Sequence, residues 1–309
     1  MTEQDPIPAI ATRGLTRQFG QLAAVSDLSL HVPPGSVYGF LGLNGAGKST
    51  TIRMLLGLLR PTKGNVALLG SAMPEDRLHA AGRIGALVEA PTVYPHLTGV
   101  ENLEATRRLL GVPRPAMARA LEVVGLSDAG HRLAREYSTG MRQRLGLALA
   151  LMGEPELLIL DEPTNGLDPR GIQEVRDLVR GLPGRVGVTV FLSSHILAEV
   201  EQVATHVGII HRGRLVAQGA LEDLLGHGML RVGVSDSTGA RERLVGLGWS
   251  ARAGDNGTLL VEAANRDDAG EVNEILVRGG HRVSHLVYER ASLEHVFFRA
   301  TGEPEEVSR

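Results

Sequence analysis

The sequence predicts an α/β protein with two domains, and three observations support this fold class. The chain has 309 residues, about twice the usual domain size of roughly 150 residues. From residue 10 to about residue 224, short apolar segments alternate with longer helical stretches, a pattern typical of strands and helices around a parallel sheet. After residues 226–228 the segments become shorter, which indicates a second, smaller domain of roughly 75 residues.

The two predicted domains also differ in charge. The chain has 32 basic and 35 acidic residues, and its whole net charge of -3 lies after residue 224. The acidic character of the small domain would suit a cationic ligand, although a solvated surface is the simpler explanation. We therefore expect a flexible leader, a larger α/β domain, a small β/α accessory domain and a flexible tail, at residues 1–9, 10–224, 225–300 and 301–309.

Composition excludes several classes of protein. The chain has no cysteine, which rules out disulfides, cysteine nucleophiles and thiolate metal sites. No stretch approaches the roughly 18 consecutive apolar residues of a membrane span, and the N-terminal segment lacks the apolar region of a secretory signal. We expect a cytoplasmic protein without direct membrane insertion, and the absence of a basic excess predicts no nucleic-acid partner.

Three continuous apolar runs predict buried strands in the larger domain. Val37–Leu43 ends in a glycine-rich turn, and a helix over Ser49–Leu59 follows it and ends before Pro61. Leu157–Leu160 and Val188–Leu192 are the other two runs. Strands buried on both faces lose their polar alternation, so these runs favour a parallel sheet.

The small domain is predicted from a series of shorter segments. Apolar stretches indicate strands at residues 230–234, 258–262 and 281–289, and helices are expected at residues 241–247, 267–278 and 292–299. This alternation predicts a small β/α fold.

The segment Gly42-Leu-Asn-Gly-Ala-Gly-Lys48-Ser49 matches the phosphate-loop pattern of P-loop NTPases, between a predicted strand and a predicted helix. Glycines let the backbone curl so that its amides point at phosphate oxygens, and the helix adds its positive dipole end. Lys48 would bridge the β- and γ-phosphates, and Ser49 would ligate Mg²⁺. A chance glycine-rich turn is the alternative, but Lys48 is one of only two lysines beside 30 arginines. The residues expected to bind ATP here are Asn44, Gly45, Ala46, Gly47, Lys48, Ser49 and Thr50.

Two carboxylates follow the second apolar run, at the end of a strand where an α/β sheet usually binds its ligand. Side chains alternate along a strand, so Asp161 and Glu162 are expected to point in opposite directions and to differ in role. Asp161 would hold Mg²⁺ through water, and Glu162 would polarise the attacking water. Alone, the pair is more typical of an ordinary loop, but beside a phosphate loop it predicts phosphoryl transfer.

A third segment, Tyr-Ser-Thr-Gly-Met-Arg-Gln-Arg at residues 137–144, opens a helix. Together with the two motifs above it resembles the ATP-binding cassette (ABC) ATPases, whose signature loop at this place reads LSGGQ. Thr139 replaces the first signature glycine and Met141 replaces the glutamine. The resemblance covers residues 8–224 and implies a P-loop NTPase core with a helical subdomain. The remainder is similar to the C-terminal extension of single-cassette drug-exporter ATPases.

The resemblance implies roles for three further residues. Phe19 lies where the family stacks an aromatic ring on adenine, and a position in the core is the alternative. Asp168 ends a segment that resembles the D-loop and would contact a second chain. His195 follows Ser193-Ser194 and resembles the switch histidine that senses the γ-phosphate, whereas a lone histidine after a strand is usually structural.

Glu89 stands where the family usually has a glutamine that contacts Mg²⁺ and the membrane partner. A glutamate can still accept a hydrogen bond from a metal-bound water, but it cannot donate one as an amide does. The surrounding sequence, GALVEAP and YPHLTGVENL, resembles that of the bacitracin-resistance and lantibiotic-immunity ATPases of the family. In that branch a glutamate is usual at this position. We hypothesise that Glu89 couples the nucleotide state to the membrane subunit; sequence drift without functional meaning is the alternative.

In the family, one cassette does not complete its own active site. The resemblance implies that Ser138 and Gly140 of a second ATPase chain donate to the γ-phosphate held by Lys48, so that ATP joins two chains, expected to be identical. It also implies separately encoded transmembrane permease subunits, which would hold the protein at the inner face of the cell membrane. The residues implied to contact Mg²⁺ are Ser49, Asp161 and Glu89, and those implied to be catalytic are Glu162 and His195.

The function class expected first is therefore the ATPase subunit of an ABC exporter, for an antibiotic or a peptide. The alternative is an ABC ATPase that acts on ribosomes or DNA without a membrane partner. Translation members of the family usually carry two cassettes in one chain, and repair members carry zinc-binding cysteines or long coiled-coil insertions. This chain has one phosphate loop, no cysteine and no basic excess, which argues against the alternative.

Overall fold

The computed structural model describes residues 6–73, 75–76, 80–89, 91–226, 228–254, 257–263 and 267–302. The chain divides into two compact units, Met1–Leu221 and Glu222–Arg309, and the boundary expected after residue 224 lies three residues further along. Each unit contains a hydrophobic core of its own.

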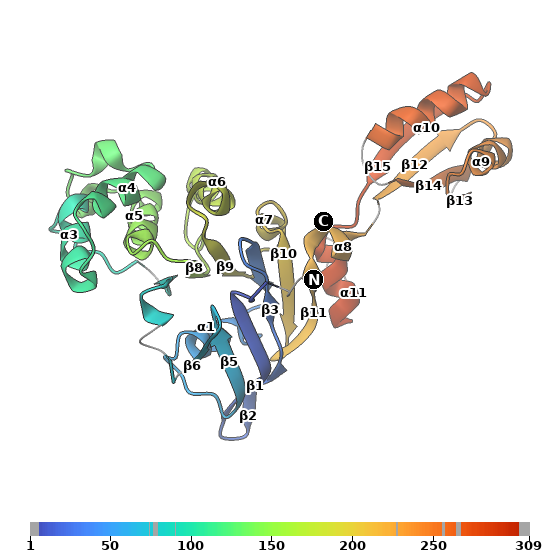
Figure 1. The fold of residues 1–309 in the computed structure, drawn as a ribbon. Coiled ribbons are helices and arrows are strands. Elements are labelled where there is room, and N and C mark those ends of the chain that lie inside the picture. Colours follow the sequence, from blue (N-terminus) through green and yellow to red (C-terminus); the bar gives the residue numbers. More distant parts are fainter. Residues whose placement is uncertain are drawn as a thin grey trace, which may run out of the picture. The chain divides into compact units, whose positions relative to one another are not determined.

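In the described part of the first unit, a six-stranded sheet forms the centre (Figure 1). It consists of β4 (Val37–Leu41), β7 (Ile84–Leu87), β8 (Leu157–Asp161), β9 (Thr189–Ser194), β10 (His206–His211) and β11 (Arg214–Ala220). The strand order is β11-β10-β4-β9-β8-β7, antiparallel between β10 and β11 and parallel elsewhere. The predicted α/β fold class is thus confirmed, and each of the three apolar runs lies in this sheet.

The ends of two predicted elements differ from the structure. Helix α1 (Lys48–Leu55) ends four residues before the predicted Leu59, because Gly57 takes a left-handed φ of 69° that no α-helix continues through. Strand β9 runs on through Ser193 and Ser194, beyond its apolar residues. This extension places Ser193 directly beside Asp161 of β8.

A second, antiparallel sheet of the first unit has five strands within the described residues. They are β1 (Ile10–Phe19), β2 (Leu22–Leu28), β3 (His31–Val32), β5 (Lys63–Leu68) and β6 (Ser71–Met73). Ala9, expected in the flexible leader, is 1% exposed, and its amide donates to Val32 O at 2.8 Å. The ordered part of the unit therefore begins before residue 10. Residues 1–5 of the expected leader lie outside the described residues.

Helices α3 (Gly99–Leu110), α4 (Pro115–Val123) and α5 (Thr139–Leu151) form a separate group beside the sheets (Figure 1). They correspond to the helical subdomain that the family resemblance implies. A capping box at Thr98 and Glu101 starts α3. Helices α6 (Pro169–Val186) and α7 (Leu197–Glu201) follow β8 and β9, and α8 (Leu221–Leu225) lies at the boundary of the two units.

The second unit has the order β12 (Gly228–Val234), α9 (Ser237–Gly246), β13 (Ala251–Ala253), β14 (Thr258–Ala263), α10 (Asp267–Arg278), β15 (Val283–Glu289) and α11 (Leu293–Thr301). The described sheet has the order β13-β14-β12-β15 with antiparallel neighbours, so the first six elements form the ferredoxin-like β-α-β-β-α-β motif. Thr301, expected in the flexible tail, ends α11. Residues 303–309 of that tail lie outside the described residues.

Candidate nucleotide-binding and catalytic site

The loop between β4 and α1 requires glycine on steric grounds. Gly45 and Gly47 have φ values of 81° and 109°, in a region of backbone conformation that residues other than glycine rarely adopt. A Cβ atom on Gly47 would lie 2.6 Å from Ala24 O, and one on Gly42 would lie 2.4 Å from Ile210 O. Gly42 and Gly47 therefore leave no room for a side chain, and Gly45 is favoured by its φ alone.

The same loop presents free amide donors. None of the described residues accepts a hydrogen bond from the backbone amides of Gly45, Gly47, Lys48, Ser49 or Thr50. The first amides of a helix have no partner within the helix, so a cluster of this kind is an anion-binding site. This donor set fits the phosphate groups of a nucleotide.

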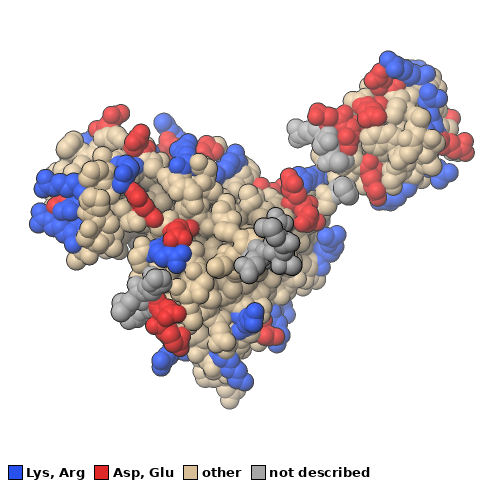
Figure 2. Space-filling model, viewed as in Figure 1, with Lys and Arg blue, Asp and Glu red and all other residues tan. Residues whose placement is uncertain are grey.

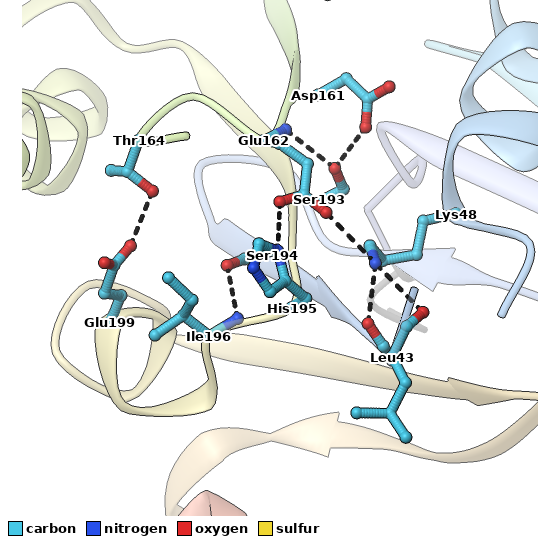
Figure 3. A network of polar contacts seen from close by, with 11 residues as sticks. Leu43, Lys48, Asp161, Glu162, Thr164, Ser193, Ser194, His195, Ile196 and Glu199 are labelled. Carbon is cyan, nitrogen blue, oxygen red and sulfur yellow. Dashed lines mark hydrogen bonds and ion pairs between the residues drawn. The ribbon is translucent and has the colours of Figure 1, made fainter. Parts of the chain in front are cut away.

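Lys48 lies at the centre of the site, with only 5% of its surface exposed. Its ammonium group donates to the carbonyl oxygens of Gly42 at 2.7 Å and Leu43 at 3.3 Å. A third partner is Glu162, whose Oε1 lies 3.2 Å away (Figure 3). These contacts hold the positive charge at the loop, where phosphate oxygens would lie.

Asp161 and Glu162 have different partners. Ser193 joins them, because its hydroxyl donates to Asp161 Oδ1 at 2.5 Å and accepts from the Glu162 amide at 3.0 Å. Glu162 has a left-handed φ of 50°, which ends the alternation of β8. Its carboxylate therefore turns toward Lys48 and His195, while Asp161 remains buried against Ser193 (Figure 3).

His195 contacts the second carboxylate oxygen of Glu162, with Nδ1 lying 2.5 Å from Oε2. One carboxylate thus connects the phosphate loop with the segment after β9. Two residues beyond Glu162, the hydroxyl of Thr164 donates to Glu199 Oε2 at 2.6 Å. Sequence reasoning missed Ser193, Thr164 and Glu199, since only the pairing of β8 with β9 brings their segments together.

Glu89 lies outside this cluster. It has a left-handed φ of 65° and forms an ion pair with Arg53 of α1, with 2.7 Å between the charged atoms. The side chain of Glu89 is 68% exposed. No hydrogen bond or ion pair among the described residues joins it to Asp161 or Ser49.

Ser138, Gly140 and Asp168 form a separate group at two adjacent helix starts. Ser138 caps α5 by accepting from the Met141 amide at 3.2 Å, and Asp168 caps α6 by accepting from the Gly171 amide at 2.8 Å. A Cβ atom on Gly140 would lie 3.5 Å from the Cα of Gly171. No hydrogen bond or ion pair within the described chain joins this group to Lys48.

Phe19 is not a core residue, because 47% of its surface is exposed. It ends β1, and the guanidinium carbon of Arg17 lies 4.5 Å from the centre of its ring. The ring is thus held at the surface by a cation–π contact.

Comparison with known proteins agrees with this geometry. Residues 25–165 match the family described as ABC transporter. The chain is 39% identical over 297 residues to the bacitracin transport ATP-binding protein BcrA of Enterococcus faecalis, across 95% of this chain and 96% of that protein. It is 40% identical over 313 residues to the daunorubicin/doxorubicin resistance ATP-binding protein DrrA of Streptomyces peucetius, across 97% and 94% of the two chains. A solved ATP-binding subunit of an ABC transporter is 29% identical, with a TM-score of 0.62 over 70% of this chain and 91% of that one.

The phosphate loop and the carboxylates define an ATP-binding and ATP-hydrolysing P-loop protein. More narrowly, the chain belongs to the ABC transporter family, as an ATPase subunit similar to the single-cassette bacitracin and drug-resistance proteins. The resemblance stated from the motifs is confirmed. Among the described helices, none is both long enough and apolar enough to cross a membrane.

Proposed function

We propose that this chain powers the export of an antibiotic or antimicrobial peptide through separately encoded transmembrane permease subunits. The observation that carries the proposal is the contact of Glu162 with both Lys48 and His195, which brings a carboxylate and an imidazole together beside the phosphate loop. Similarity to proteins of bacitracin transport and of daunorubicin resistance over almost the whole chain supports the substrate class.

Nucleotide binding is assigned to the loop and its surroundings. The free amides and Lys48 bind the phosphates, and Phe19 stacks on adenine. Mg²⁺ prefers hard oxygen ligands, which the hydroxyl of Ser49 and, through water, the carboxylate of Asp161 supply. When bound, Mg²⁺ neutralises the charge on the phosphate groups.

Hydrolysis is assigned to Glu162 and His195. Glu162 accepts a proton from the attacking water, and His195 holds the carboxylate and supports the charge that develops on the γ-phosphate. A second ATPase chain completes the site with Ser138 and Gly140, and Asp168 contacts that chain. Positioning and electrostatic stabilisation account for most of the catalysis of phosphoryl transfer.

Glu89 is assigned to coupling between nucleotide and permease. In the permease complex, Glu89→Gln should change the ratio of transport to ATP hydrolysis, because an amide donates where a carboxylate only accepts. The measurement is ATPase rate and export in the same membranes. An unchanged ratio would contradict this role.

An ATPase acting on ribosomes or DNA is not favoured by the comparisons. Binding to nucleic acid depends on clustered basic side chains. Figure 2 shows basic and acidic side chains interspersed on the visible face, consistent with the net charge of -3.

The whole-cell test is antibiotic susceptibility in a sensitive bacterium. Co-expression of the chain with the permease encoded beside it should raise resistance to bacitracin or to an anthracycline, and Glu162→Gln should abolish the gain. The matched control is Glu122→Gln, which neutralises an exposed acid of α4. Resistance that survives Glu162→Gln would contradict the proposal.

A further inference from the structure

Two short segments begin side by side at the paired ends of β8 and β9. Residues 161–164 carry the two carboxylates, and residues 193–199 carry the switch histidine. Three side-chain contacts join them in order: Ser193 to Asp161, His195 to Glu162, and Glu199 to Thr164 (Figure 3). The first two contacts involve proposed site residues, whereas the third has no part in the proposed function.

The surroundings of the third contact, between Thr164 and Glu199, favour a strong hydrogen bond. Thr164 and Glu199 are both partly buried, and the hydroxyl lies 2.6 Å from Glu199 Oε2. A small pocket beside the pair has walls that are mostly apolar. A hydrogen bond to a charged group is stronger in such surroundings, and removing one partner leaves the other poorly solvated. The apolar residues that line the pocket are Pro163, Val175, Val179, Leu192, Val200 and Val203.

The contact closes a short ring that contains the proposed base. From Glu162 the ring passes through Pro163 to Thr164 and crosses to Glu199 of α7. It returns through the start of this helix and its N-cap to His195, and closes at Glu162. The proline fixes one backbone torsion and the helical turn fixes several more. The ring therefore resists changes in the distance between Glu162 and His195.

We infer that Thr164 and Glu199 are a positioning pair that sets the rate of ATP hydrolysis by holding Glu162 against His195. The inference rests on the proposed roles of Glu162 and His195. Neither member of the pair contacts the phosphate loop through any polar interaction found among the described residues. The pair therefore affects kcat and leaves ATP affinity unchanged.

The test uses the purified full-length chain and separates kcat from nucleotide binding. Thr164→Val replaces the hydroxyl by a methyl group of the same size, and Glu199→Ala removes the acceptor. A displacement of about 1 Å can cost up to about 100-fold in rate, and we expect kcat to fall about tenfold in each variant. The Kd of a fluorescent ATP analogue should stay within about twofold. The double variant should be no slower than the slower single variant, because both remove one contact.

Conservative variants keep the test valid if Thr164→Val or Glu199→Ala fails to fold. Thr164→Ser retains the hydroxyl and Glu199→Gln retains an acceptor oxygen, so both should keep kcat within about threefold of the original chain. Glu122→Ala is the control for loss of a surface acid. The inference is overturned if Thr164→Val and Thr164→Ser have equal kcat, if the single effects multiply in the double variant, or if analogue affinity falls in parallel. Normal turnover in Glu162→Gln would instead overturn the proposed base, whatever Thr164 does.

Discussion

At the scale of single residues, Glu162 connects the phosphate loop with the segment that follows β9. One of its carboxylate oxygens lies 3.2 Å from the ammonium group of Lys48, and the other contacts His195. Its backbone amide is fixed by Ser193. Two contacts to the carboxylate and one to the backbone amide fix the orientation of Glu162, and a general base needs a fixed orientation toward the water that it activates.

Replacing this carboxylate by an amide of the same shape tests its role as the base. Glu162→Gln should bind ATP and hydrolyse it at least about 100-fold more slowly, since a general base contributes about 10²–10⁴-fold. Single-turnover ATPase and equilibrium nucleotide binding measure the two properties. Turnover within about tenfold of the original chain would refute the assignment.

Lys48 gives a second prediction at this scale. Its 5% exposure leaves little space for the planar guanidinium group of arginine, the cation that this chain uses almost everywhere else. Both Lys48→Ala and Lys48→Arg should weaken ATP binding by about tenfold or more, as expected for losing a charge-assisted hydrogen bond. Isothermal titration with ATP measures the loss, and Lys63→Arg, at the exposed start of β5, is the control. Full affinity in Lys48→Arg would show that charge alone suffices.

At the scale of elements, two helix starts carry the residues expected to act on a second chain. Ser138 and Asp168 are both N-caps, so each side chain already has a structural role in its own helix. The hydrogen bonds that begin α5 and α6 therefore also fix the side chains of Ser138 and Asp168.

The two roles of Asp168 can be separated. Asp168→Ala should lower the free energy of unfolding by about 1 kcal/mol, because it removes the cap of α6, whereas Asp168→Asn should retain most of that stability. Chemical denaturation measures the first effect, and ATP-dependent dimerisation of each variant measures the second. If Asp168→Asn is stable but does not dimerise, the charge contacts the partner. If it dimerises normally, capping alone explains the residue.

At the scale of the whole molecule, the chain consists of two units with separate cores, and the phosphate loop belongs to the first. Ligand binding stabilises only the unit that binds the ligand. Heating should therefore produce two unfolding transitions, and Mg²⁺-ATP should raise only one of them.

Glu162→Gln is the suitable chain for this measurement, since slow hydrolysis preserves the ligand. At ATP concentrations about 100-fold above Kd, the first unit gains about 2.7 kcal/mol. Calorimetry follows both transitions, and addition of a chelator should return the shifted one toward its starting temperature if Mg²⁺ takes part in binding. A shift of both transitions would place nucleotide contacts in the second unit as well.

Much of the fold could be predicted from local sequence. The apolar runs in β4, β8 and β9 identify buried strands, and the phosphate loop is recognisable because its glycines are required by the backbone itself. The antiparallel sheet of the first unit and the short strand β13 were not predicted. Their pairing depends on partners distant in sequence, and β13 has only three residues.

The sequence by itself determined the family, the phosphate loop and the identity of the two carboxylates, because those properties depend on residue type and spacing along the chain. Only the tertiary structure decided which groups meet. Asp161 and Ser193 are 32 residues apart and Thr164 and Glu199 are 35 apart, and each pair forms because β8 and β9 are neighbours in the sheet. A hydrogen bond depends on distance in space, which strand pairing sets and local sequence does not.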